Sequence, residues 1–245
     1  MILMATCLGK QDFGRVTFEY QEDILANVKS GGPDTLILFE PNRHTYAEGA
    51  RCRRRPDEEK YRISLAEIQE FADVYEVSRG GHVTYHGPGQ IVGYLITDIK
   101  RRGGKKFREE LEGGLRNAAH ILGAIHADII SERMFDPRPG VERETRQYAI
   151  WHRENGQDNK LAAIGIGMPE PKYTNHGFAF NVSPQLEMFE HIYPCGFTDK
   201  GATSLSKILG RDIVIGEVQE IIAQEVAKSL GYESVQTNSL DLLSK

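Results

Sequence analysis

The stretch that is most informative about the fold reads Arg79-Gly80-Gly81-His82-Val83-Thr84-Tyr85-His86-Gly87-Pro88-Gly89-Gln90. The residues at 82–85 and 91–96 are mainly β-branched, aromatic or apolar, which predicts two strands joined by the Gly-Pro-Gly turn, and we expect both in one sheet. Glycine lets a backbone approach a ligand closely, while arginine, threonine, tyrosine and histidine side chains supply hydrogen-bonding groups. The stretch therefore also predicts a binding surface.

The rest of the chain alternates between helical and extended patterns. Helices are expected at Phe13–Lys29, Lys105–Leu122, Ser204–Leu209 and Gly216–Leu230. Strands are expected at Ile2–Leu8, Thr35–Phe39, Asp73–Val77, Ile125–Ile130, Tyr148–His152, Leu161–Met168 and His176–Val182, and residues 41–60 read as a polar segment. This mixed order predicts an α/β or α+β fold, with a mixed β-sheet layered by helices. We expect a single domain over residues 1–245 that ends in a helical segment at 204–232.

Composition excludes several classes of function. The chain has 245 residues and a formal net charge of −5, so it lacks the basic excess that nucleic-acid binding usually requires. Its three cysteines are widely spaced and odd in number, which suits a reducing compartment and fits no zinc ribbon. No run of eighteen apolar residues is present. We therefore expect a cytoplasmic protein that uses neither a membrane nor a nucleic acid as partner.

Two cysteines are candidate nucleophiles. Cys195 stands between Pro194 and Gly196 in a stretch that reads as a loop, where a thiol can reach a substrate. Cys52 lies within a run of four arginines, a field that would lower its pKa, although such a run is usually a solvated surface. Cys7 lies in an apolar strand and is expected to behave as a small hydrophobic residue. Residue chemistry alone leaves the choice between Cys195 and Cys52 open.

Two strand segments carry one ionisable residue each. Lys160 is predicted to open the apolar strand that follows it, where a lysine commonly ends in water. If it lies against that strand instead, its ammonium loses solvation and can exchange protons more readily. His176 opens another small, mostly apolar strand, and a satisfied core histidine is the simplest interpretation there.

In their order along the chain, four motifs resemble one family. They are the stretch at 79–90, Lys160-x-Ala162-x-Ile164-Gly165, His176-Gly177-Phe178-Ala179-x-Asn181-Val182, and Pro194-Cys195-Gly196. Over residues 5–210 the chain resembles the octanoyltransferases of lipoate biosynthesis. The resemblance implies the fold of biotin and lipoate protein ligases. It also implies transfer of an octanoyl group from acyl carrier protein to a specific lysine of lipoyl domains, as in 2-oxoacid dehydrogenase E2 subunits, or of glycine cleavage H protein.

The same resemblance assigns roles to residues. It makes Cys195 the acyl-thioester nucleophile and Lys160 its partner, which favours the thiolate and transfers protons. The residues it implies for the acyl pocket are Arg79, Gly80, Gly81, His82, Val83, Thr84, Tyr85, His86, Ala163, Ile164, Gly165, Gly177, Phe178 and Ala179. It implies no ATP and no metal, because the donor carries its acyl group on phosphopantetheine, and we expect a monomer.

Two segments depart from the family pattern. Phe39–Tyr46 stands where a Glu-His-Pro-Pro-x-Tyr-Thr element is typical, and residues 131–148 are longer and more charged than the usual connection before a Gly-Val-Trp strand, whose counterpart here is Ala149-Ile150-Trp151. Three other functions stay open. They are an ATP-dependent lipoate or biotin protein ligase, an octanoyl amidotransferase acting between lipoyl carrier proteins, and a non-catalytic module that binds lipoyl domains.

Overall fold

A computed structural model describes residues 1–54, 56, 59–102, 106–128, 133–135, 144–146, 148–154, 156–193 and 201–239. Its strands are β1 (Ile2–Gln11), β2 (Thr35–Pro41), β3 (Thr45–Glu48), β4 (Asp73–Glu76), β5 (Val83–His86), β6 (Gln90–Ile96), β7 (Ala127–Asp128), β8 (Arg133–Phe135), β9 (Glu144–Arg146), β10 (Ala149–Glu154), β11 (Gln157–Glu170), β12 (Tyr173–Asn181), β13 (Gly201–Ala202) and β14 (Ser234–Ser239). Its helices are α1 (Phe13–Arg15), η1 (Val16–Tyr20), α2 (Gln21–Lys29), α3 (Ala50–Arg54), α4 (Leu65–Phe71), η2 (Ile99–Arg102), α5 (Phe107–Ile121), η3 (Leu186–His191), α6 (Leu205–Leu209) and α7 (Ile215–Ser229).

A large mixed sheet forms the centre of the molecule, which confirms the predicted fold class. Its strand order is β14-β1-β2-β6-β12-β11-β10-β7, with β13 paired to β11. The pairs β1–β14, β1–β2 and β11–β13 are parallel, and the other pairs are antiparallel. The strands at the centre are buried along their whole length, which explains why they read as apolar runs in the sequence.

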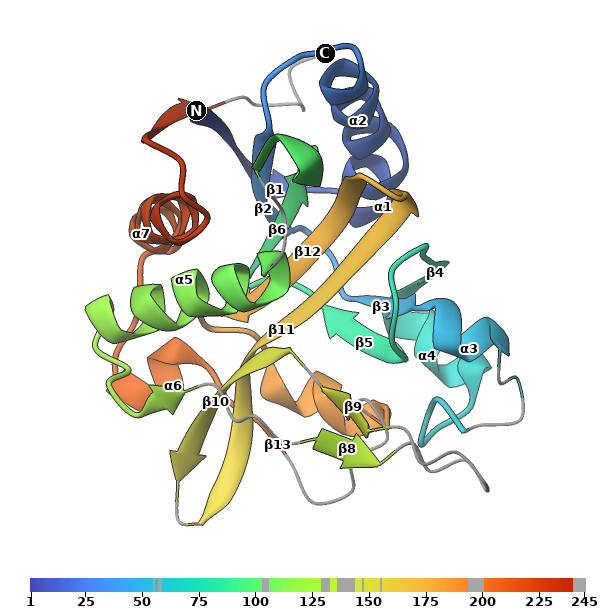
Figure 1. Cartoon of the computed structure of the whole chain (residues 1–245). Helices are drawn as coiled ribbons and strands as arrows, with labels where there is room; N and C mark the ends of the chain where they lie inside the picture. The colour runs from blue at the N-terminus through green and yellow to red at the C-terminus, as the bar shows by residue number, and fades with distance from the viewer. Residues whose placement is uncertain are drawn as a thin grey trace.

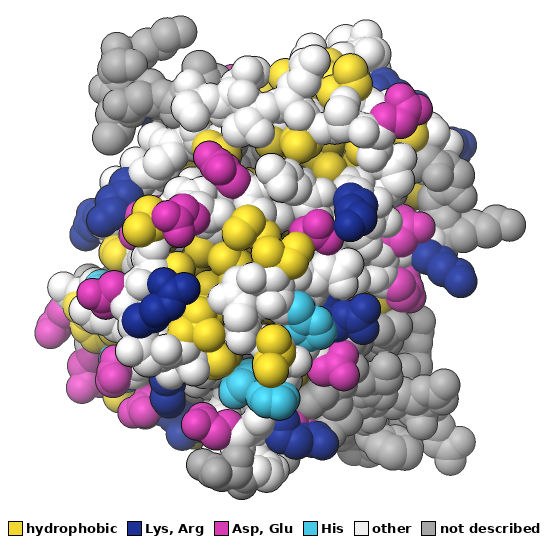
Figure 2. Space-filling model, turned by 90° about the vertical axis from the view of Figure 1, so that its left-hand side faces the viewer, with side chains coloured by type: hydrophobic (Ala, Val, Ile, Leu, Met, Phe, Trp, Pro, Cys, Tyr) yellow, Lys and Arg dark blue, Asp and Glu magenta, His cyan; other side chains and the backbone are white. Residues whose placement is uncertain are grey.

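Helices cover both faces of this sheet (Figure 1). Side chains alternate along β2, so that Leu36 and Leu38 face α5 and α7 while Ile37 and Phe39 face α1 and α2. The surface on the side of α5 and α7 shows hydrophobic side chains gathered near its centre among lysines, arginines and acids (Figure 2). No helix in the described part of the chain is long and apolar enough to cross a membrane.

A second, three-stranded sheet lies beside the main one, in the order β4-β3-β5 (Figure 1). The prediction that the strands on either side of the Gly-Pro-Gly turn share one sheet is wrong. β5 pairs with β3 in the small sheet, whereas β6 pairs with β2 and β12 in the main sheet. The turn carries the chain between the two sheets. Gly89 has a φ of 87° there, and a Cβ at this position would collide with the backbone of Ser183, so both the conformation and the available space require glycine.

The long helices agree with the sequence pattern. The helix expected over 13–29 is one continuous helical run, in which η1 is a π-helical turn between α1 and α2. α5 and α7 lie in the predicted positions and pack closely, because a Cβ at Gly114 would come within 2.9 Å of Val226 Cα. α6 begins after Ser204, whose side chain accepts a hydrogen bond from the amide of Lys207 as an N-cap.

Other predictions need correction. Residues 41–60 are not simply a polar segment, since β3 and α3 lie within them, and the strand predicted at 125–130 is described only as β7. Lys160 does not open its strand, because β11 begins at Gln157. The chain after α7 forms β14, an edge strand that the sequence pattern did not reveal. Of the divergent stretch at 131–148, the described parts include the β8–β9 pair.

Candidate functional site

Four small residues form a trough on one face of the main sheet. Ala163 of β11 lies opposite Ala179 of β12, and Gly165 lies opposite Gly177. Because alternate residues of a strand share a face, these two pairs lie next to each other and leave room above the sheet. A Cβ at Gly165 would come within 2.9 Å of Arg79 Cδ, so the trough requires glycine there. We call the space above these four residues the trough.

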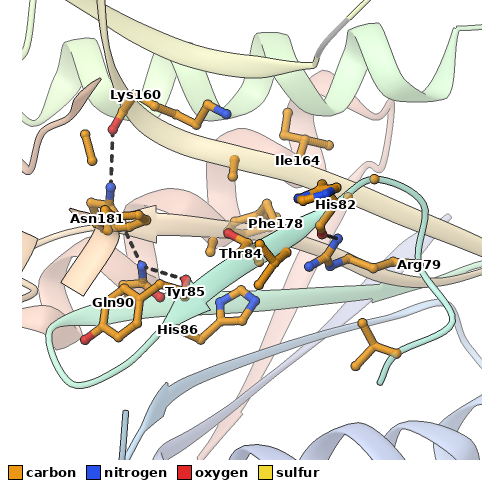
Figure 3. A pocket seen from close by; sticks show the side chains of 18 of the residues that line it. Arg79, His82, Thr84, Tyr85, His86, Gln90, Lys160, Ile164, Phe178 and Asn181 are labelled. Carbon is orange, nitrogen blue, oxygen red and sulfur yellow. Dashed lines mark hydrogen bonds between the residues drawn. The ribbon is translucent and has the colours of Figure 1, made fainter. Parts of the chain in front are cut away.

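The glycine-rich loop before β5 lies across this trough and is held by the side chain of Arg79. Its Nη1 donates hydrogen bonds to the carbonyl oxygens of Gly80 and His82, at 2.8 and 3.0 Å, and its Nη2 donates one to Ala47 O at 2.7 Å. Arg79 is only 9% exposed. Gly81 has a φ of 87°, a conformation that favours glycine. The arginine therefore fixes the loop against β3 and places its backbone over the trough (Figure 3).

Two histidines of the site are uncharged. His86 is buried and stacks on Phe13, with 4.9 Å between the ring centroids, and His176 is 4% exposed. Burial, and after it the positive charge of Arg79, lowers the pKa of each imidazole to about 3. Both rings are therefore neutral near pH 7, and they present uncharged walls that an acyl chain can contact without displacing a charge.

Lys160 stands at one end of the trough. Its Nζ lies 4.8 Å from the ring centroid of Trp151, on β10, and its side chain runs along β11 toward Ile164 (Figure 3). The ammonium is thus held against an aromatic face and half-buried beside the cavity, rather than extended into bulk water.

Two buried amides join this end of the trough to its surroundings. Asn181 Nδ2 donates to Lys160 O at 3.2 Å, and Gln90 Nε2 donates to Asn181 Oδ1 at 2.9 Å (Figure 3). Asn181 Nδ2 also donates to Thr203 O at 2.9 Å. The amide of Thr203 also donates to Lys160 O. This network ties β6, β12 and β11 to the segment that follows β13.

A cavity of about 540 Å³ contains the trough. Every residue that the sequence resemblance implied for the acyl pocket lines this cavity, and so does Lys160. The residues that sequence reasoning did not assign to it are Phe13, Arg62, Val77, Gln90, Tyr94, His176, Asn181, Leu186, Glu187, Phe189, Glu190, Gly201, Ala202 and Lys207. Gln90, His176 and Asn181 belong to motifs quoted above but were not assigned to the pocket, whereas the others reach the cavity from elements outside those motifs.

The predicted nucleophile, Cys195, falls outside the described residues, which stop at 193 and resume at 201. The next described residues, Gly201 and Ala202, line the cavity and pair in parallel with Asn159 and Lys160. After the segment that contains Cys195, the described chain therefore resumes directly beside Lys160.

The other two cysteines lie elsewhere. Cys52 is 1% exposed, and burial, with Glu48 as the second cause, raises the pKa of its thiol. This reverses the expectation that the neighbouring arginines would lower it, because the side chain turns into the apolar interior beneath α3. Cys7 is half-buried in β1 and its pKa is also raised by burial. Neither lines the cavity.

No group of three His, Cys, Asp or Glu side chains within the described ranges could hold a metal ion. The arrangement offers instead a trough of small residues beside two neutral histidines, with a lysine at one of its ends.

Comparisons of sequence point to one group of proteins. The family model described as the lipoyl protein ligase A/B catalytic domain matches residues 14–227. A protein of Geobacter metallireducens named octanoyltransferase is 36% identical over 219 residues, which cover 87% of this chain and 89% of that protein. An octanoyltransferase of Mycobacterium leprae is 34% identical over 225 residues, covering 91% of this chain and 86% of its own.

Solved structures share the fold at lower identity. A bi-partite lipoate protein ligase from Thermoplasma acidophilum superposes with a TM-score of 0.65 and 14% identity, covering 99% of this chain and 89% of its own. Lipoate-protein ligase A bound with ATP gives a TM-score of 0.66 and 15% identity, with coverage of 97% and 89%. These likenesses confirm the lipoate protein ligase fold that the sequence resemblance implied.

Proposed function

Because this chain belongs to the octanoyltransferase family of lipoyl protein ligase A/B catalytic domains, we propose that it moves an octanoyl group from acyl carrier protein to a lysine of lipoyl domains or glycine cleavage H protein. Between the two transfers, Cys195 carries the acyl group as a thioester. Lys160 donates a proton in the first transfer and accepts one in the second. The family match over residues 14–227 supports one catalytic domain for the chain. The proposed reaction uses neither ATP nor a metal.

In the first step, the Cys195 thiolate attacks the carbonyl carbon of the octanoyl thioester. A carbon–sulfur bond forms to Cys195, the bond to the phosphopantetheine sulfur breaks, and the Lys160 ammonium gives its proton to the departing thiolate. One thioester replaces another, so the step needs no nucleotide. A free cysteine has a pKa of about 8.5 and is mostly protonated at neutral pH, and a neighbouring ammonium favours its thiolate form.

In the second step, the amine of the acceptor lysine attacks the same carbonyl carbon. A carbon–nitrogen bond forms, the bond to Cys195 breaks, and the neutral Lys160 takes up a proton from the amine. A free lysine has a pKa of about 10.4, so an acceptor amine must lose a proton before or during the attack. This returns Lys160 to its ammonium form and Cys195 to its thiolate.

One observation carries the proposal: the trough ends at Lys160, and the described chain resumes after the segment containing Cys195 at Gly201 and Ala202, beside the same lysine. The residues of the trough are small and its histidine walls are uncharged, as an alkyl chain requires. The contact of Lys160 Nζ with Trp151 supports a fixed position for the proton donor.

Intact-protein mass spectrometry tests the nucleophile. After incubation with octanoyl acyl carrier protein, the wild-type protein should gain one octanoyl group. Cys195→Ser should remove the adduct, whereas the matched control Cys52→Ser should retain it because Cys52 is buried away from the cavity. Lys160→Met should slow formation of the adduct while the protein stays folded. An adduct that persists in Cys195→Ser would exclude this thiol as the acyl carrier.

A transfer assay separates the proposal from its alternatives. Adding an unmodified lipoyl domain should move the octanoyl group to its lysine without ATP, whereas a ligase would require ATP and free octanoate. An amidotransferase would prefer an octanoylated H protein as donor over acyl carrier protein, so competition between the two donors decides that case. A non-catalytic binding module would form the complex with the lipoyl domain but never the acyl adduct.

A further inference from the structure

His176 has an unusual backbone conformation. Among the residues that the structure describes, it is the only non-glycine residue with a positive φ, 55°. A side chain with a Cβ rarely adopts this conformation, and it persists where the surrounding structure imposes it, often at a functional site. His176 is 4% exposed and lies in β12, next to Gly177 of the trough.

The conformation changes the side to which the imidazole points. Gly177 and Ala179 face the trough, whereas Phe178 and Phe180 pack in the core beneath α5 and α7, although Phe178 also reaches the cavity. Regular alternation would direct His176 toward that core as well. The positive φ places its ring instead beside Tyr94, at an edge-on centroid distance of 5.4 Å, on the side of α1 and α2.

Neighbouring groups hold the ring and the backbone there. Nε2 of His176 lies 2.9 Å from Ser78 Oγ, and its backbone amide donates to Gln21 Oε1 at 2.7 Å. Gln21 Nε2 in turn donates to Thr17 O, within the π-helical turn η1. Two unusual backbone features, a π-helical turn and a left-handed residue, are thus joined through one side chain, and π-helical turns often mark functional sites.

The position of the ring matches the length of an octanoyl chain. His176 lies opposite Ile166 of β11, which is six residues beyond Lys160, or about 20 Å along a strand. The proposed mechanism brings the acyl carbonyl next to Lys160 Nζ. From that placement, a lysine side chain and an extended octanoyl chain laid end to end span roughly 15 Å, from carbon–carbon bonds of about 1.5 Å. The difference between these two lengths is close to the contact distance between a terminal methyl group and the imidazole ring.

On the basis of the proposed octanoyl transfer, we propose that the imidazole of His176 closes the inner end of the trough and sets the length of the acyl chain that it accepts. The ring blocks the ninth and later carbons of a longer chain, and its neutral face contacts the terminal methyl group of an octanoyl chain. His176 is then a residue that determines specificity and takes no part in the chemistry at Lys160.

The test compares donors of different length in wild type and His176→Gly. Glycine suits a φ of 55°, so this variant removes the ring without adding backbone strain. The measured quantity is the ratio of kcat/KM for dodecanoyl to that for octanoyl acyl carrier protein, with a lipoyl domain as acceptor. Each additional buried methylene is worth a factor of about 4, so we expect this ratio to rise at least about tenfold. His176→Asn, which tolerates a positive φ and is smaller, should shift it in the same direction.

Ser78→Ala serves as the control, because it removes a hydrogen-bond partner of the imidazole but leaves the ring in place. Its ratio should stay within about twofold of wild type. An active His176→Gly protein that loses rate equally for all donors would overturn the assignment, as would a Ser78→Ala protein whose ratio rises as much as that of His176→Gly.

The binding of free octanoic and dodecanoic acid to wild type and His176→Gly measures the same preference without transfer. Absence of octanoyl transfer by the wild type would refute the proposed function, whereas an unchanged preference in His176→Gly refutes only the role of His176.

Discussion

The buried neutral histidines of the trough predict that the protein loses stability as the pH falls below about 6.5. Burial, followed by the charge of Arg79, lowers the pKa of His86 and His176 to about 3 in the folded protein. An unfolded histidine titrates near pH 6.5. Because the folded pKa is the lower one, the stabilising contribution of each group is fully present above pH 6.5. It is lost progressively as the pH falls from there toward 3, since the unfolded chain binds protons that the folded chain does not.

The magnitude depends on the two pKa values. One pH unit corresponds to about 1.4 kcal/mol for each group within this window. Acidification from pH 7 to pH 5 should therefore lower the free energy of unfolding by about 2 kcal/mol for each histidine, or about 4 kcal/mol for both. Since a protein is typically stable by only 5–15 kcal/mol, this loss is large enough to measure.

Urea denaturation at a series of pH values measures this loss, with the fluorescence of Trp151 and far-ultraviolet circular dichroism as independent probes. The matched variant is His176→Asn, which keeps a side chain that tolerates the positive φ and removes the titrating group. Between pH 7 and pH 5, the variant should lose about 2 kcal/mol less than the wild type. Equal losses in the two proteins would refute the reasoning, because His176 would then titrate alike in both states.

Two further perturbations have effects that can be read from the contacts. Asn181→Ala removes the buried hydrogen bonds to the carbonyl groups of Lys160 and the segment after β13, so thermal unfolding should show a loss of about 2–4 kcal/mol, and the octanoylation rate should fall more than it does in Gln90→Met. Gly114→Ala should destabilise by about 1–3 kcal/mol, because its Cβ would lie 2.9 Å from the backbone of α7. Gly113→Ala meets only Ser229 Oγ at 3.3 Å and should gain up to about 1 kcal/mol from helix propensity, so equal effects of the two substitutions in denaturation curves would contradict this packing.

Elements whose stability depends on a local pattern could be predicted from the sequence. The helical run at 13–29 and the pair α5 and α7 have apolar residues at helical spacing, and the central strands are continuous apolar runs. β3 lacks such a pattern, because its sequence Thr45–Glu48 ends in a carboxylate. Glu48 is nonetheless buried, since Lys60 Nζ lies 2.7 Å and Tyr61 Oη 2.9 Å from its carboxylate oxygens. Only the folded structure brings these partners together.

Strand pairing was the part of the fold that local signals could not give. A Gly-Pro-Gly turn between two extended segments fits a hairpin and a crossover between sheets equally well. The outcome depends on β3, which is distant in sequence and pairs with β5, and on β2 and β12, which occupy both edges of β6. The local sequence therefore identified the strands but not their partners.

The residues of the candidate site likewise divide into those that the sequence could single out and those that it could not. Residues that act through their type, such as the glycines at 80 and 81 and Lys160, could be singled out because few residues offer their conformational freedom or charge. His176 and Asn181 were left out of the predicted site because their part in it depends on a backbone angle and on long-range amide contacts. The sequence does contain a signal for the first of them. Asparagine and histidine before a glycine, as at 175–177, are among the residues that tolerate a positive φ.

Arg79 illustrates why identifying a residue differs from assigning its role. Its charge suggested a donor for a ligand, yet the guanidinium donates to the carbonyl oxygens of Gly80, His82 and Ala47. Those bonds hold the glycine loop over the trough, and the same charge also lowers the pKa of His86 and His176. Burial is the main reason why the neighbouring imidazoles are neutral, and the buried cation adds to this effect while its own charge is directed at backbone carbonyls. In the proposed reaction, the chemistry of acyl transfer is confined to the end of the trough where Lys160 lies.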